Sequence, residues 1–187
     1  MKVMVIPEDP TLDQYILKPV MERMFLDLGR KARVQVLANP RLRGVAQALD
    51  AATVARVVAM YPMIDLFCIM VDRDGEPGRP IEAGRREAEH PDRLMVCLAV
   101  EEVEVWMLAV HREGLVAPWQ DVRSERDPKE RFAQPFLAAH APSHSLGEGR
   151  VWAMRELGSK WRGVLTVCPE LEELKQRLGA WLARHGE

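Results

Sequence analysis

Residues 64–75 read Ile64-Asp65-Leu66-Phe67-Cys68-Ile69-Met70-Val71-Asp72-Arg73-Asp74-Gly75. The continuous apolar part of this stretch is typical of a strand buried on both faces, as in the middle of a parallel sheet. Because an unpaired carboxylate is very costly to bury, we expect Asp72 and Asp74 where the strand leaves the core. Ligands of open α/β sheets bind at this carboxyl edge, so the stretch predicts a central strand that ends in a functional site.

Asp72 and Asp74 are two residues apart, so in an extended segment their side chains project to the same side. Two such carboxylates suit a hard cation, Mg²⁺ or Mn²⁺, which keeps some of its water for a phosphate substrate. The alternative is a solvated turn, because Asp-x-Asp-Gly is also a common turn sequence.

Strand and helix patterns alternate over the first hundred residues. Apolar strand patterns occupy residues 2–6, 34–37, 64–71 and 94–100, and helical patterns occupy residues 11–28, 45–58 and 81–90. In the first helix, Pro19 marks either a kink or the true helix start. This alternation predicts an α/β fold with a sheet of about four mostly parallel strands flanked by helices.

The character of the chain changes after Val100. Apolar residues recur at helical spacing in residues 101–111, 129–139, 150–157 and 170–184, while the short run Val164–Val167 fits either a strand or a helix. We therefore predict an α/β core over residues 1–110 and a helical C-terminal extension over residues 111–187 that packs on it.

The composition is that of an ordinary globular protein, with 48% hydrophobic and 29% charged residues. The net charge of −2 provides no overall basic field to attract nucleic acid, although a local basic patch is compatible with it. The three cysteines, Cys68, Cys97 and Cys168, are better explained as small buried hydrophobic residues than as a disulfide or metal framework. No signal peptide and no membrane-length apolar run is visible, so we expect a cytoplasmic protein with no membrane partner.

A further acid, Glu8, follows the first strand as Asp72 follows the third. If these strands are neighbours, Glu8, Asp72 and Asp74 meet at one edge, where a shared divalent cation would relieve their repulsion. Glu8 could instead cap the following helix. Glu102 and Glu104 follow another buried strand, where they either complement a helix dipole or reach the same crevice to bind a second metal or orient water.

The sequence segments around these acids resemble those of a known fold. The segment Val5-Ile6-Pro7-Glu8-Asp9-Pro10-Thr11 together with Val71-Asp72-Arg73-Asp74-Gly75 resembles the Toprim fold, the metal-binding domain of topoisomerases, primases and OLD-type nucleases. The segments Ala99-Val100-Glu101-Glu102-Val103-Glu104-Val105-Trp106-Met107-Leu108-Ala109, Asp127-Pro128-Lys129-Glu130 and Cys168-Pro169-Glu170-Leu171 are similar to a small bacterial family of Toprim-like proteins, the DUF4276 family. The Glu-Val-Glu-Val-Trp segment is the most specific part of this resemblance.

The resemblance implies a set of site residues. Glu8, Asp72 and Asp74 would be the metal-site acids, with Glu102 and Glu104 as the family's additional acids. Glu8 and Lys129 are the catalytic candidates, with Lys129 stabilising charge in the transition state unless it is a solvated lysine at a helix start.

The leading hypothesis is a Mg²⁺- or Mn²⁺-dependent phosphodiester-processing enzyme, a nuclease-like protein acting on nucleic acid, in a bacterial defence system. Arg79, Arg85 and Arg86 would be close enough to the acidic loop to contact phosphates, although a solvated, charged helix is the more ordinary interpretation of these arginines. The alternative is a non-catalytic Toprim-like interaction module that works with a partner such as an ATPase. A third reading, a phosphatase of the haloacid dehalogenase type, ranks last because that family carries its Asp-x-Asp after the first strand.

Overall fold

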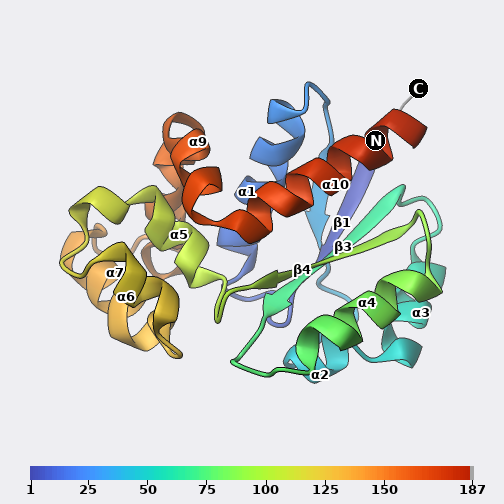
Figure 1. The fold of residues 1–187 in the computed structure, drawn as a ribbon, viewed down its shortest axis with the longest axis horizontal. Coiled ribbons are helices and arrows are strands. Elements are labelled where there is room, and N and C mark those ends of the chain that lie inside the picture. The colour runs from blue at the N-terminus through green and yellow to red at the C-terminus, as the bar shows by residue number, and fades with distance from the viewer. Residues whose placement is uncertain (186–187) are drawn as a thin grey trace.

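Four strands pair in parallel in the order β2–β1–β3–β4 in the computed structural model, which describes residues 1–185 (Figure 1). The strands are β1 Lys2–Ile6, β2 Arg33–Val36, β3 Leu66–Asp72 and β4 Leu94–Ala99. The register pairs Val5 with Cys68 and Asp72 with Ala99, so β1, β3 and β4 end at a common edge. The predicted α/β fold with a four-stranded parallel sheet, flanking helices and a helical C-terminal part is confirmed.

Helices cover both faces of the sheet. They are α1 Gln14–Asp27, α2 Val45–Ala48, α3 Ala51–Met60, α4 Arg79–Glu89, α5 Glu104–Val110, α6 Trp119–Ser124, α7 Gln134–His140, α8 Arg150–Ala153, α9 Leu157–Val167 and α10 Pro169–His185. Short 3₁₀ segments lie at η1 Arg112–Gly114, η3 Leu146–Gly149 and η4 Met154–Glu156, and a π-helical turn lies at η2 Lys129–Ala133. Figure 1 shows α1 and α10 on one face of the sheet and α2, α3 and α4 on the other. None of the helices within residues 1–185 combines the length and apolar composition needed to cross a bilayer.

Alternate strand residues enter two separate cores. Val5 and Met70 pack in the core shared with α1, α5, α9 and α10, whereas Ile6 and Val71 pack in the core shared with α2 and α3. This is the period of two expected of strands buried on both faces. Asp72 comes two residues after Met70, so its side chain emerges on the face covered by α1 and α5.

Three local predictions are refined by the structure. The first helix, α1, begins at Gln14 and continues through Pro19, so the proline marks neither its start nor its end. The predicted helix over residues 45–58 is two helices, because Asp50 caps α3 by accepting a hydrogen bond from the Thr53 N–H at 2.8 Å. Residues 164–167 are helical and belong to α9.

The three cysteines are confirmed as buried residues. Cys68, Cys97 and Cys168 carry free thiols within the described chain, and each is almost completely covered by neighbouring side chains. Burial raises the pKa of the Cys68 thiol to about 12, which keeps this group neutral and unreactive.

Candidate functional site

Asp72 is the centre of the candidate site. It is the last residue of β3, and it is only 6% exposed although it is an acid. Its Oδ1 accepts a hydrogen bond of 2.8 Å from the Val103 N–H, which ties it to the segment that leads into α5. Burial, followed by the nearby Glu8 and Glu104 carboxylates, raises the pKa of Asp72 to about 10. Asp72 is therefore protonated at neutral pH when no cation is bound.

Glu8 reaches Asp72 from the neighbouring strand. It follows β1, and its backbone carbonyl accepts a hydrogen bond of 3.1 Å from the Gly44 N–H, which fixes the turn after the strand. The Glu8 and Asp72 carboxyl groups lie close enough for each to affect the pKa of the other. Two partly buried acids this close repel each other unless at least one of them is protonated. Burial, followed by the Asp74 charge, raises the pKa of Glu8 and so favours its protonated form.

Glu104 lies on the same side, held by two cations. It is the first residue of α5 and is 2% exposed, and its Oε1 lies 2.6 Å from a terminal nitrogen of Arg150, which is 1% exposed. The Lys129 Nζ lies 4.0 Å from the same oxygen. Although burial disfavours its charge, the Glu104 carboxylate raises the pKa of Lys129, so Lys129 stays charged.

Two residues of this cluster were missed by reasoning from the sequence. Asp13 is buried just before α1, and burial followed by the Glu104 charge raises its pKa to about 7. Asp13 directly precedes the first residue of α1, but its side chain does not cap the helix and instead accepts a hydrogen bond from the Asp9 N–H at 3.2 Å. Arg150 has no local signal, because its role depends on Glu104, 46 residues away along the chain.

The remaining two predicted ligands lie at the margin of the cluster. The Glu102 carboxylate accepts a hydrogen bond of 2.7 Å from the Lys129 backbone N–H, and burial raises its pKa to about 7. Asp74 is half exposed, and its Oδ2 lies 3.4 Å from an Arg79 nitrogen.

We predicted that the side chains of Asp72 and Asp74 point in a common direction because the segment is extended. In the structure, the extended conformation ends at Asp72. The backbone N–H groups of Arg73 and Asp74 both point at the Glu101 carbonyl, at 3.0 and 3.4 Å, so the chain turns. Asp74 adopts a left-handed conformation with φ of 53° in this turn. It remains close enough to Glu8 to raise the pKa of that carboxyl group.

A formed metal-ligand shell is not present among residues 1–185, where no three His, Cys, Asp or Glu side chains are grouped around a common point. Instead, the raised pKa of Asp72 keeps it protonated beside Glu8, and Arg150 pairs with Glu104. The donor atoms are nevertheless carboxylate oxygens, which are the ligands that Mg²⁺ and Mn²⁺ prefer. The chemistry of these donor atoms fits such a cation, whose binding would require Asp72 to lose its proton.

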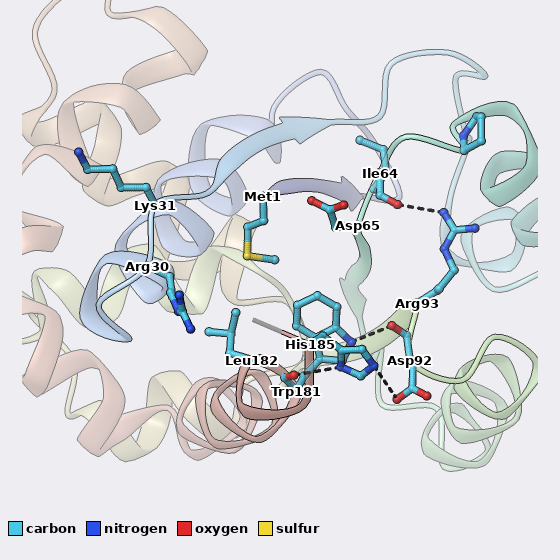
Figure 2. A pocket seen from close by; sticks show the side chains of 11 residues that line it. Met1, Arg30, Lys31, Ile64, Asp65, Asp92, Arg93, Trp181, Leu182 and His185 are labelled. Atoms are coloured by element: carbon cyan, nitrogen blue, oxygen red, sulfur yellow. Dashed lines mark hydrogen bonds and ion pairs between the residues drawn. The ribbon is translucent and has the colours of Figure 1, made fainter. Parts of the chain in front are cut away.

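A separate cavity of about 670 Å³ lies at the opposite, amino edge of the sheet (Figure 2). Two of its charged side chains, Asp65 and Arg93, form hydrogen bonds with backbone groups of the chain. Asp65 accepts a hydrogen bond of 2.6 Å from the Lys2 N–H, and Arg93 donates to the Ile64 carbonyl at 2.9 Å. Trp181 donates to the Asp92 carbonyl at 2.7 Å. None of the acids predicted for the site lines this cavity.

The fold and the site together define a parallel α/β protein with a buried cluster of acids at the carboxyl edge of its sheet. Compared with models of known families, with curated proteins and with solved structures, the chain shows no significant match. Its resemblance to the Toprim fold and to the DUF4276 family therefore stays a prediction.

Proposed function

We propose that the chain is a Mg²⁺- or Mn²⁺-dependent phosphodiester-processing enzyme, a nuclease-like Toprim protein. The observation that carries the proposal is the burial of Asp72 against Glu8 and Glu104, since buried acids facing one another are stable only when they share protons or a cation. Glu8 and Asp72 would hold the metal ion, with Asp74, Glu102 and Glu104 in support.

The proposal gives each group a role. The metal ion would supply Lewis-acid stabilisation of a phosphoryl oxygen and a lowered pKa for bound water. Lys129, whose Nζ lies 4.0 Å from Glu104, would add positive charge beside the phosphate in the transition state. Glu8, in its deprotonated form, would accept a proton from the attacking water.

Asp72→Asn tests the proposal directly, because the amide keeps the shape of the side chain but cannot ionise. Asp121→Asn is the matched control, since Asp121 is exposed on α6. We expect Mn²⁺ to raise the melting temperature of the parent and of Asp121→Asn, but not of Asp72→Asn. Mn²⁺-dependent cleavage of a labelled oligonucleotide should follow the same order. A parent that neither responds to Mn²⁺ nor cleaves any oligonucleotide would rule out the proposal.

The second candidate belongs to a different class, a non-catalytic interaction module that binds a partner such as an ATPase. It is favoured by an apolar groove of about 540 Å³ in the helical part, lined by Phe132 and Phe136 and bordered by the fully exposed Val116. An apolar segment of the partner would cover this groove. Native purification that yields the chain alone would count against it. Both candidates place the protein in the cytoplasm, where buried free thiols such as Cys68 persist.

A further inference from the structure

Arg126 covers the acidic loop after β3. A Cβ atom placed on Gly75 would lie 2.9 Å from a terminal nitrogen of Arg126 and 3.3 Å from its Nε. Gly75 has φ of 61°, in the left-handed region that favours glycine, and directly follows Asp74. The guanidinium therefore lies against the bare backbone of Gly75, in the loop that follows Asp72 and Asp74.

Arg126 differs from the nearby arginines in that its side chain has no partner within the described part of the chain, residues 1–185. The neighbouring arginines are each paired with a carboxylate: Arg73 with Glu101, Arg79 with Asp74, Arg123 with Glu170 and Arg131 with Glu125. By contrast, the Arg126 guanidinium forms no hydrogen bond or ion pair with residues 1–185, and the residue is solvent-exposed. Its donors are thus available to an external anion.

Hydrogen bonds hold the backbone around Arg126 in place. The Glu125 Oε1 accepts hydrogen bonds from the N–H groups of Arg126 and Asp127, at 2.9 and 3.4 Å, while its Oε2 pairs with Arg131. Three residues after Arg126, the Lys129 backbone N–H donates to Glu102 at 2.7 Å. The segment is therefore held at both ends while the Arg126 side chain is free to bind, an arrangement that lowers the entropy lost on binding.

We infer that Arg126 binds a phosphate of a nucleic acid backbone, adjacent to the phosphate that reacts at the acid cluster. The inference rests on the proposed function and extends it to the substrate. Lys129 contacts Glu104 within the cluster, whereas the Arg126 guanidinium lies against Gly75 in the loop after Asp74, so the two cations would serve different phosphates. A guanidinium fork matches two oxygens of one phosphate. The substrate class is thus an oligonucleotide with at least two phosphates and not a phosphate monoester.

Arg126→Ala and Arg126→Lys test this contact, with Arg162→Ala as the matched control because Arg162 is exposed on α9. Binding of a short labelled single-stranded DNA, and of the RNA of the same sequence, is measured by fluorescence anisotropy in Ca²⁺ over a salt series, with gels to show that the probe stays intact. We expect Arg126→Ala to weaken binding about tenfold and to reduce the salt slope by about 0.7, the share of one phosphate contact on a single strand. Arg126→Lys should keep the salt slope but lose part of the affinity, because it keeps the charge without the fork.

Mn²⁺ affinity, measured by calorimetry on the same variants, separates the two proposals. All three variants should bind Mn²⁺ as the parent does, since Arg126 lies outside the ligand set. If the parent binds both Mn²⁺ and the oligonucleotide while Arg126→Ala matches Arg162→Ala in affinity and salt slope, the role of Arg126 is overturned and the proposed function stands. If the parent binds Mn²⁺ but no oligonucleotide, or binds neither, both the substrate class and the role of Arg126 are wrong.

Discussion

Asp72 shows at the residue scale how one buried carboxyl group links stability to pH. Burial raises the pKa of Asp72 to about 10 and that of Asp13 to about 7, each from an ordinary value of 3.8. Both acids therefore keep a proton in the folded state that the unfolded chain has lost. Folding takes up protons, so this contribution is complete below pH 3.8 and is lost as the pH rises through the folded-state values.

We predict that the metal-free protein loses stability as the pH is raised from about 6 to about 8, by about 1.4 kcal/mol per pH unit for each proton taken up. Asp72→Asn removes one titrating group, so its free energy of unfolding should fall less steeply with pH. Urea denaturation of both proteins at several pH values measures the difference, and Asp121→Asn should keep the slope of the parent. A parent whose stability is constant or rises over this range would contradict the prediction.

A second residue-scale feature is the buried ion pair of Arg150 with Glu104. Removing one partner of such a pair leaves an uncompensated charge in the core. We predict that Arg150→Met lowers the free energy of unfolding by about 3–5 kcal/mol. The double variant Arg150→Met/Glu104→Leu should recover most of this loss, because it removes both charges together. Urea denaturation of the single and double variants completes the cycle; additive losses would show that the two side chains do not act as a pair.

At the scale of elements, one carboxylate connects three helices. Glu170, in the first turn of α10, accepts hydrogen bonds of 2.8 Å from Trp106 Nε1 on α5 and of 2.8 and 2.9 Å from the two terminal nitrogens of Arg123 on α6. Both Glu170 and Arg123 are mostly buried, so these charge-assisted bonds are little screened by solvent. The position of the short helix α6 therefore depends on α10.

We predict that Glu170→Gln loosens α6 without unfolding the sheet. Loss of a bidentate, charged contact should raise hydrogen exchange at residues 119–124 by about tenfold or more, whereas β3 should stay protected. Glu173→Gln is the matched control, because Glu173 is exposed in the same helix. Exchange measured by mass spectrometry distinguishes a local from a global effect; equal increases in α6 and β3 would mean that Glu170 supports the whole fold.

At the scale of the whole molecule, the core on the α1 side combines residues from both parts of the chain. Val5 and Met70 of the sheet share it with Trp161, Leu174 and Leu178 of the C-terminal helices. Removing residues 111–187 would expose the apolar residues of the sheet and of α1 that this part covers, and each exposed large side chain costs about 1.5–3 kcal/mol. Such losses exceed the usual net stability of a domain.

We therefore predict that the fragment of residues 1–110 does not fold cooperatively, whereas the full chain unfolds in a single transition. Circular dichroism during urea titration compares the two proteins. If only the full chain shows a single cooperative transition, the predicted boundary at residue 110 marks a change of composition within one folding unit. A sharp transition in the fragment would show instead that residues 1–110 are an independent domain.

The tertiary structure also explains which residues of the site could be predicted from the sequence and which could not. Asp72 and Glu8 could be predicted because each directly follows a run of apolar strand residues, and parallel neighbours end at one edge. Asp74 was harder to place, because the turn is set by hydrogen bonds to the Glu101 carbonyl, 27 and 28 residues further along the chain. No pattern within a short window of sequence contains that contact.

The sequence by itself determined the central buried strand, the parallel α/β architecture and the acids at its carboxyl edge, since hydrophobic periodicity and the cost of burying charge act locally. Only the tertiary structure decided that Asp13 and Arg150 belong to the acid cluster and that Arg126 covers Gly75. Each of these depends on contacts between segments that are distant in the sequence, where packing and charge pairing, not local propensity, choose the neighbours.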